Sequence, residues 1–207
     1  MMRDLFAEPE RDSSIYSITN IGWKEAAKLV SQFHYLGKTR FLGSQCFGLL
    51  ADGCLVGCVV YGPLSVPNTA QSAFGLPRGN YPDLVEMHRL VLASSFNGAN
   101  AASYLVGRSI RELKRNNIRA VISYADSSRH VGSVYQACNF TYHGLSPQKV
   151  DYYINGKKLS RGTIKGKEYT SVPRSRKHRY VYLIDKKLEI IWPKSEYPKS
   201  TLDGEQE

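Results

Sequence analysis

An acidic residue at the end of a buried strand is the first place in this sequence where residue types and spacing could support chemistry. The run from Ala120 to Ala125 combines β-branched and aromatic residues, which predicts a buried strand. Asp126 follows in a polar run, Asp-Ser-Ser-Arg-His, that a hydrophobic core could not absorb. From Val131 to Cys138 the apolar residues recur at helical spacing, with Tyr135 among them. Because α/β proteins bind ligands beyond the carboxyl ends of their strands, this stretch predicts an active-site crevice.

Each of these side chains also has a purely structural interpretation. Asp126 could cap the helix that follows, and Tyr135 at helical spacing could belong to the core. Arg89 lies in a strand predicted over residues 84–92 and could either pair with an acid or hold an anionic group. Because charges are costly to bury, we expect the charged residues of this strand, Glu86 included, to face solvent or a site.

Two polar stretches next to predicted helices are candidate ligand sites. A helix predicted over 22–33 ends at His34 and Tyr35, a pair that either packs the helix end or stays open to a ligand. A polar turn precedes a second helix, predicted from Ala101 to about Arg115. Free N–H groups and the dipole at a helix N-terminus favour anions, so the turn is a candidate anion site. Its residues are Asn97, Gly98, Ala99 and Asn100.

The predicted elements alternate between strands and helices. Their order is strand, helix, hairpin, strand, polar turn, helix, strand, acidic turn, helix and strand, which predicts an α/β fold with a mixed central sheet flanked by helices. Asp52-Gly53 and Asn155-Gly156 each predict a hairpin turn, and residues 64–82 predict a long binding loop or lid. The predicted parts are an N-terminal flexible arm (1–15), a core (16–145), a basic β extension with the final strand (146–187) and a flexible tail (188–207).

Positive charge is concentrated in the C-terminal part of the chain. The net charge is +10, and the segment from Lys149 to Lys187 holds twelve basic and three acidic residues, whereas the remainder holds sixteen and fifteen. Such a segment favours a polyanion, nucleic acid ahead of a membrane surface. The residues we expect to contact nucleic acid are Lys165, Arg174, Arg176, Lys177 and Arg179.

Composition narrows the class of protein further. No apolar run approaches the roughly 20 residues that span a bilayer, and the charged N-terminus lacks an apolar signal core. The four cysteines include no Cys-x-x-Cys pair, so we expect them to be reduced and mostly buried rather than zinc ligands. These features predict a cytoplasmic protein without a membrane partner.

The order of elements resembles the acyl-CoA-binding core of GNAT-type acyltransferases. The strand over 84–92, the polar turn, the next helix and the strand after it carry this resemblance, together with the ending Tyr135-Gln-Ala-Cys-Asn-Phe140. The GNAT pyrophosphate signature, Gln/Arg-x-x-Gly-x-Gly/Ala, is present only in degenerate form over residues 97–101. This departure puts ordinary acetyl-CoA chemistry in doubt.

A combination of motifs also resembles the Mom family of bacteriophage DNA-modification proteins, from about residue 30 to residue 185. The motifs are His34-Tyr35, Val60-Tyr61-Gly62-Pro63, Glu86-Met-His-Arg89, Tyr124-Ala-Asp126, Val134-Tyr-Gln-Ala-Cys-Asn-Phe140 and Arg179-Tyr-Val-Tyr182. The resemblance implies a GNAT-like enzyme in the host cytoplasm that converts adenine in DNA to an N6-carbamoylmethyl form. That modification would shield the DNA from host restriction enzymes.

The resemblance also implies roles for individual residues. Asp126 would be a base or an orienting group, with Ser127 beside it, and Arg89 would hold a phosphate or an acyl oxygen. Tyr61 and Tyr135 would donate protons or hydrogen bonds. His34 and Tyr35 would be ligands to iron, with Asp126 completing the set.

The implied partners are double-stranded DNA and a donor of the transferred group. The target adenine must be flipped out of the duplex to be reached. The donor is either glycyl-tRNA or an acyl-CoA, and a dimer is compatible with the sequence. Two other functions stay open: a GNAT-type acetyltransferase that acts on a protein or small molecule, and a non-enzymatic nucleic-acid-binding protein.

Overall fold

The computed structural model describes residues 16–34, 43–96, 100–160 and 162–199. The described residues form two compact units. The first unit contains the chain up to residue 122 together with 182–191, and the second contains 123–181 together with the residues from 192 onwards. The predicted N-terminal arm, 1–15, lies outside the described residues.

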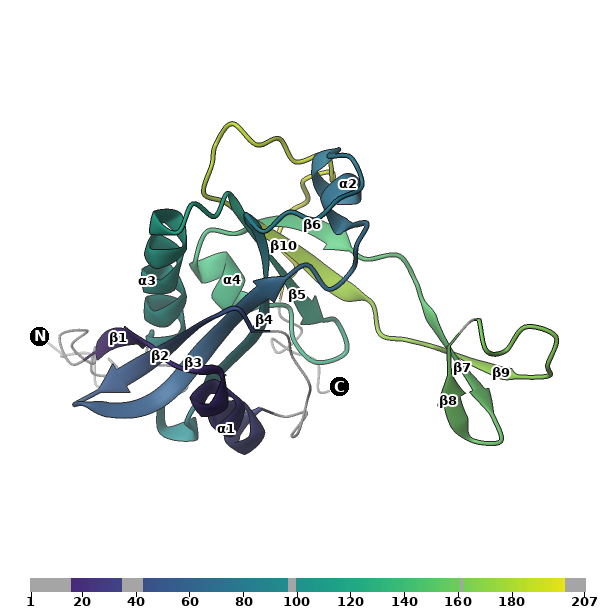
Figure 1. Ribbon diagram of the computed structural model, residues 1–207, viewed down its shortest axis with the longest axis horizontal. Coiled ribbons are helices and arrows are strands. Elements are labelled where there is room, and N and C mark those ends of the chain that lie inside the picture. Colours follow the sequence, from purple (N-terminus) through teal and green to yellow (C-terminus); the bar gives the residue numbers. More distant parts are fainter. Residues whose placement is uncertain (1–15, 35–42, 97–99, 161, 200–207) are drawn as a thin grey trace, which may run out of the picture. The chain divides into compact units, whose positions relative to one another are not determined.

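The first unit is built on an antiparallel meander (Figure 1). Strands β1 (Tyr16–Asn20), β2 (Gln45–Ala51), β3 (Cys54–Pro63) and β4 (Leu84–Leu92) pair in this order, each antiparallel to the next. Strand β5 (Ala120–Asp126) then starts parallel to β4, with Leu84 opposite Ala120. The predicted mixed sheet is therefore confirmed. So is the turn at Asp52-Gly53, where both residues have positive φ, 49° and 77°.

Two helices cover opposite faces of this sheet. Helix α1 (Trp23–Phe33) begins where the Glu25 carboxylate accepts the Gly22 N–H at 2.8 Å. Its apolar face packs on Cys58 and Val60 of β3. Tyr61 points the other way, and its hydroxyl bonds to Ser109 of helix α3 (Ala101–Arg115) at 2.7 Å. Both predicted helices are confirmed within one residue.

A short helix replaces part of the long loop predicted over residues 64–82. Helix α2 (Thr69–Phe74) ends at Gly75, whose φ of 67° is the left-handed value that glycine adopts without strain. The Ile191 N–H donates to the Ala73 carbonyl at 2.8 Å and holds the end of this helix. The prediction of a continuous loop was wrong because six residues are too few to show a helical repeat. A 3-10 turn, η2 (Ser94–Phe96), follows β4.

The second unit contains the end of β5, helix α4 (Ser133–Ala137) and the strands β6 (Thr141–Leu145) and β10 (Lys177–Leu183). Strands β6 and β10 are antiparallel. Helix α4 is shorter than predicted because it starts after Gly132, whose φ is 83°. A Cβ at Gly132 would lie 2.8 Å from the rings of both Tyr135 and Tyr180, so glycine is required for packing as well as conformation.

A separate three-stranded sheet makes up much of the predicted basic extension (Figure 1). Strands β7 (Val150–Ile154), β8 (Lys157–Leu159) and β9 (Thr170–Pro173) pair in the order β8-β7-β9, all antiparallel. The predicted turn at Asn155-Gly156 is confirmed, with φ values of 50° and 73°. We call the segment from Lys149 to Arg174 the ribbon.

The segment after Ile191 lies along β6. The Trp192 carbonyl is 3.0 Å from Nδ1 of His143, the Ser195 N–H donates to the Tyr142 carbonyl at 2.9 Å, and the Tyr197 hydroxyl donates to the Phe140 carbonyl at 2.7 Å. The sequence predicts a flexible tail from residue 188, yet residues 192–199 make these specific contacts.

All four cysteines are free thiols; Cys46 and Cys58 are buried, Cys138 is half-buried and Cys54 is exposed. In the described part of the chain, no helix has the length and apolar character needed to cross a bilayer.

Candidate active site and nucleic-acid interface

Asp126 lies at the carboxyl end of β5, where the sequence places it, and it is held by three donors. Ser128 donates its N–H and its hydroxyl to Oδ1, at 3.1 and 2.8 Å. The Lys177 ammonium, from the start of β10, pairs with Oδ2. The lysine reaches this carboxylate because β10 lies beside the end of β5, as shown by the 3.1 Å bond from the Ser127 N–H to the Arg176 carbonyl.

These contacts fix the charge state of Asp126. Burial alone would raise the pKa of the carboxyl, but the hydrogen bonds from Lys177, Ser175 and Ser128 outweigh it and hold the pKa well below its usual range. Asp126 is therefore a carboxylate throughout the neutral range and a weak base. The geometry favours an orienting role over proton abstraction for this residue.

Two histidines that the sequence analysis does not single out lie in the same part of the second unit. His130 ends the turn after β5, and its N–H donates to the Asp126 carbonyl at 3.0 Å. His178 follows Lys177 on β10, and its Nδ1 lies 2.8 Å from the Tyr142 hydroxyl. Burial is the main cause that lowers the pKa of both imidazoles; the Asp126 charge opposes this for His130, and the proximity of His130 adds to it for His178. A neutral imidazole close to a fixed carboxylate, as at His130, is a suitable proton acceptor.

The contacts of Tyr135 and Ser127, the other predicted catalytic residues of the second unit, serve packing and backbone pairing. Tyr135 is buried, and its ring centroid lies 5.1 Å from that of Tyr180 and 5.7 Å from that of Phe140. Ser127 is exposed, and its backbone joins β5 to the chain before β10. The predicted catalytic roles of Tyr135 and Ser127 stay predictions.

Tyr61 and Arg89 belong to the first unit. Tyr61 is fully buried against Phe47, with ring centroids 6.1 Å apart, so its hydroxyl near Ser109 serves the core. The Arg89 guanidinium donates to the His88 carbonyl at 2.5 Å and is half-buried. The expected anion-binding role of Arg89 stays a prediction.

Glu86 and His88 form a largely buried polar cluster on β4, whereas the sequence predicts that the charged residues of this strand face solvent or a site. Glu86 is only 8% exposed and does not face solvent. Its carboxylate accepts the N–H and the hydroxyl of Ser65, both at 2.9 Å. His88 lies beside it, and its Nε2 is 3.0 Å from the Pro63 carbonyl. Glu86 and His88 therefore anchor the chain that leaves β3.

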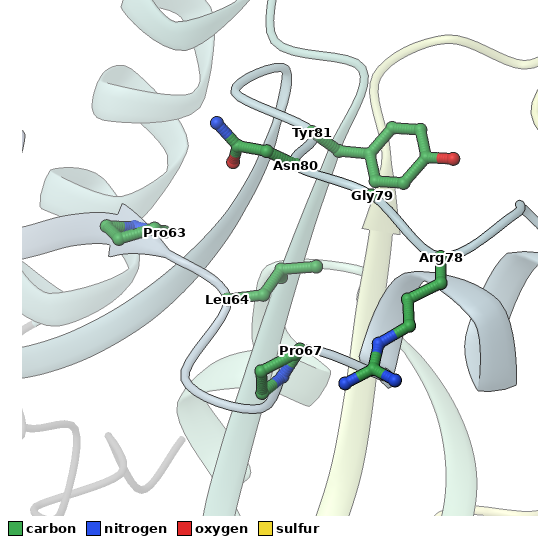
Figure 2. A pocket seen from close by; sticks show the side chains of 7 residues that line it. All are labelled: Pro63, Leu64, Pro67, Arg78, Gly79, Asn80 and Tyr81. Carbon is green, nitrogen blue, oxygen red and sulfur yellow. The ribbon is translucent and has the colours of Figure 1, made fainter.

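This anchored chain forms one wall of a pocket of about 390 Å³ (Figure 2). The opposite wall comes from the segment before β4. The lining residues are Pro63, Leu64, Pro67, Arg78, Gly79, Asn80 and Tyr81. The volume is at the small end of ligand pockets, which run from about 300 to 1,000 Å³.

The predicted anion turn is described only in part. Asn97, Gly98 and Ala99 lie outside the described residues. Asn100 precedes α3 with a φ of 53°, and its carbonyl accepts the Ser103 hydroxyl at 2.9 Å. Helix α3 carries no acid in its first turn, which is compatible with an anion there.

The predicted iron site is not supported. His34 caps the end of α1, where its N–H donates to the Val30 carbonyl at 2.9 Å, and Tyr35 lies outside the described residues. In residues 16–34, 43–96, 100–160 and 162–199, no group of three or more His, Cys, Asp or Glu side chains is arranged to hold a metal ion. We therefore derive no step through a metal.

Most of the predicted nucleic-acid-binding residues already have internal partners. Arg174 pairs with Asp151, and Lys177 pairs with Asp126. Arg176 donates to the Ser146 carbonyl at 2.7 Å. Arg179 donates to the His143 carbonyl at 2.5 Å and lies 4.6 Å over the Trp192 ring. Lys165 is exposed on the ribbon.

The family comparison covers most of the chain. A sequence model described as the Mom protein family matches residues 15–199, a range that includes both units. No curated protein matches the chain significantly.

Solved structures show that the fold is that of GNAT-type acetyltransferases. The ribosomal-protein-S18-alanine N-acetyltransferase from Escherichia coli is 10% identical, with a TM-score of 0.53 over 82% of this chain and 94% of that one. A putative acetyltransferase from Salmonella typhimurium, solved with its cofactor acetyl-CoA, is 13% identical, with a TM-score of 0.53 over 83% and 95%. A putative GNAT-family acetyltransferase from Desulfovibrio desulfuricans is 10% identical, with a TM-score of 0.50 over 81% and 98%.

Proposed function

Because this chain belongs to the Mom protein family, we propose that it is a transferase that modifies N6 of adenine in double-stranded DNA. The product would be N6-carbamoylmethyladenine, which protects the DNA from host restriction enzymes. The observation that carries the proposal is the family match over residues 15–199, which spans the Asp126 site and the ribbon. The GNAT-type fold supports transfer of an acyl-like group to an amine.

The chemistry requires a base, because N6 of adenine is a poor nucleophile whose lone pair is delocalised into the ring. When N6 forms its new bond it must lose a proton. Asp126 is held as a carboxylate by Lys177 and would orient the adenine amine through a hydrogen bond. The neutral imidazole of His130 is the better proton acceptor, and the adjacent carboxylate would stabilise the imidazolium that forms.

The adenine must leave the duplex before it can react. Extruding a base costs a few kcal/mol and exposes a flat ring that stacks on aromatic side chains. An Arg side chain such as Arg89 would bind a phosphate or the carbonyl oxygen of the donor. The roles of Arg89 and of a stacking aromatic residue are proposed from residue chemistry alone.

The donor is one of two classes. The carbamoylmethyl group, CH2–CO–NH2, has the same heavy atoms as a glycyl group, so glycyl-tRNA followed by rearrangement would supply it. An acyl-CoA would instead use the N-terminus of α3, and one structurally similar acetyltransferase binds acetyl-CoA; an acyl-CoA donor would have to carry the amide nitrogen of the product in its acyl group, since an acetyl group lacks it. Growth with 15N-glycine separates the two, because a glycyl donor carries the labelled nitrogen into the modified base.

The proposal is tested by mass spectrometry of nucleosides from the DNA of cells that express this chain. We expect a deoxyadenosine species heavier by C2H3NO, and we expect none from an Asp126→Asn variant, which keeps the shape of the side chain but removes its charge. Unmodified DNA in the presence of folded wild-type protein would contradict the proposal. Tight binding of CoA in that case would favour the acetyltransferase alternative.

A further inference from the structure

The ribbon carries positive charge that the protein does not neutralise. Between Lys149 and Arg174 the sequence holds seven basic and two acidic residues. Asp151 pairs with both Lys158 and Arg174. Within the described part of the ribbon, the other four lysines make no ion pair and are exposed. They are Lys149, Lys157, Lys165 and Lys167. The described part of the ribbon thus carries four lysines without an ion pair, whereas the cations of β10, Lys177 and Arg179, have internal partners.

The end of the ribbon is a narrow two-stranded tip. Strand β9 pairs with β7 only as far as Tyr153, opposite Thr170, so beyond that point the two-stranded tip consists of the pair Ile154–Lys157 and the turn between them. Asn155 and Gly156 form its turn. No atom lies within 4 Å of the position where a Cβ at Gly156 would be, so the tip is surrounded by open space. The major groove of B-DNA, about 12 Å wide, admits a two-stranded ribbon of this kind.

We propose that this hairpin is the DNA-reading element of the protein: its tip enters the major groove with Asn155 and Lys157 facing base edges, while Lys149, Lys165 and Lys167 contact phosphates. The inference rests on the proposed function, which makes duplex DNA the substrate. An Asn side chain offers a donor and an acceptor that match the N6 and N7 edge of adenine, and Lys matches O6 and N7 of guanine.

The composition of the ribbon favours a duplex over single strands or membranes. Single-stranded nucleic acid needs open aromatic faces for stacking. The ribbon's Tyr152 and Tyr169 pack edge to face, with ring centroids 5.2 Å apart, which covers one ring face; Tyr169 is 51% exposed, so direct comparison of single strands with duplex decides between them. A membrane-binding tip needs apolar residues, whereas this tip reads Asn-Gly-Lys-Lys.

The phosphate contacts are tested by salt dependence in the full-length protein. We expect Lys165→Gln/Lys167→Gln to lower the slope of log K against log salt by about 2 and to weaken duplex binding at least roughly tenfold near 0.1 M salt. Lys24→Gln/Lys28→Gln removes the same charge from exposed positions of α1 and is the matched control, for which we expect an unchanged slope. Equal losses in both double variants, or none in either, would overturn the proposal, as would tighter wild-type binding to single strands than to duplex.

Base reading by the tip is tested by Asn155→Gly. Glycine adopts the positive φ of this turn without strain, so the variant keeps the hairpin and loses only the amide. We expect selection from a random duplex pool to show a relaxed sequence preference, with circular dichroism unchanged. An unaltered preference would overturn the base-reading role.

Binding and modification are measured separately, so the two proposals fail in different ways. If the wild type modifies DNA and the lysine variant binds duplex as the wild type does, the ribbon inference is wrong and the function stands. If the ribbon governs duplex binding but no modified adenine forms, the ribbon inference stands and the proposed function is wrong.

Discussion

The Asp126 site and the ribbon differ in how their charges are paired: the Asp126 carboxylate has internal partners, whereas most lysines in the described part of the ribbon have none. At Asp126 the carboxylate is saturated by Lys177 and Ser128, and two imidazoles with lowered pKa values belong to the same unit, His178 buried and His130 exposed. On the ribbon, the lysines at 157, 165 and 167 are exposed. A preorganised polar network is suited to orienting a small reacting group. Dispersed and solvated cations are suited to a long polyanion, whose binding gains from counterion release.

The largest expected effect concerns activity. We expect Asp126→Asn to lower the rate of adenine modification at least about 100-fold, as the loss of a positioned polar group in an active site does. Duplex affinity should stay within about twofold, since the ribbon is untouched. Single-turnover kinetics and equilibrium binding on the same protein check this separation. A parallel loss of rate and affinity would show that the two regions are not independent.

The next largest effect is expected on the stability of the second unit, at the packing around Gly132. We expect Gly132→Ala to lower the free energy of unfolding by about 3 kcal/mol, because alanine is strained at a φ of 83° and its Cβ meets the rings of Tyr135 and Tyr180. Urea titration measures the change. Gly162→Ala on the ribbon is a control, since no atom lies within 4 Å of a Cβ there. Similar losses for both variants would contradict the packing argument.

A smaller effect concerns pH. The imidazoles of His130, His143 and His178 have lowered pKa values, mainly through desolvation, so the unfolded chain binds more protons than the folded one as the pH falls below about 6.5. Stability should therefore be fully present above that pH and decline below it. We expect His178→Gln to flatten this decline between pH 7 and pH 5, measured by urea unfolding. An equal slope in the variant would show that His178 does not contribute.

The smallest effect is expected on the ribbon. Asp151 pairs with Lys158 and Arg174, whose side chains are about half exposed, so Asp151→Asn should cost no more than about 1 kcal/mol. The same change removes a negative charge beside the proposed DNA contact and should tighten duplex binding. Thermal unfolding and a binding titration check the two outcomes. Weaker binding would place Asp151 in the contact itself.

Local patterns predicted the fold better than the site. Turn residues with positive φ, such as Asp52-Gly53 and Asn155-Gly156, are readable from the sequence because few residues adopt that conformation. The pairing of Asp126 with Lys177 joins residues 51 positions apart and depends on how β10 lies beside β5. No local pattern contains that information. The polar pair Lys177-His178 at the start of β10 indicates that a site is near, but it does not show which residue Lys177 contacts.

The same limit applies to the proposed nucleic-acid interface. Composition located positive charge between Lys149 and Lys187. It could not show which cations are already used inside the protein, as Arg179 is by carbonyl groups and by the Trp192 ring. Of the ribbon lysines only Lys165 is predicted from the sequence; Lys149, Lys157 and Lys167 become candidates because most of the other predicted cations have internal partners.

The most direct test of the proposed adenine-modifying function is nucleoside mass spectrometry on DNA from cells that express the wild type, Asp126→Asn or Lys165→Gln/Lys167→Gln. We expect adenine carrying the added C2H3NO in the wild type, none with Asp126→Asn, and a reduced but detectable amount with the lysine variant. DNA that stays unmodified in the presence of folded wild-type protein, or that is modified equally with Asp126→Asn, would contradict the proposal.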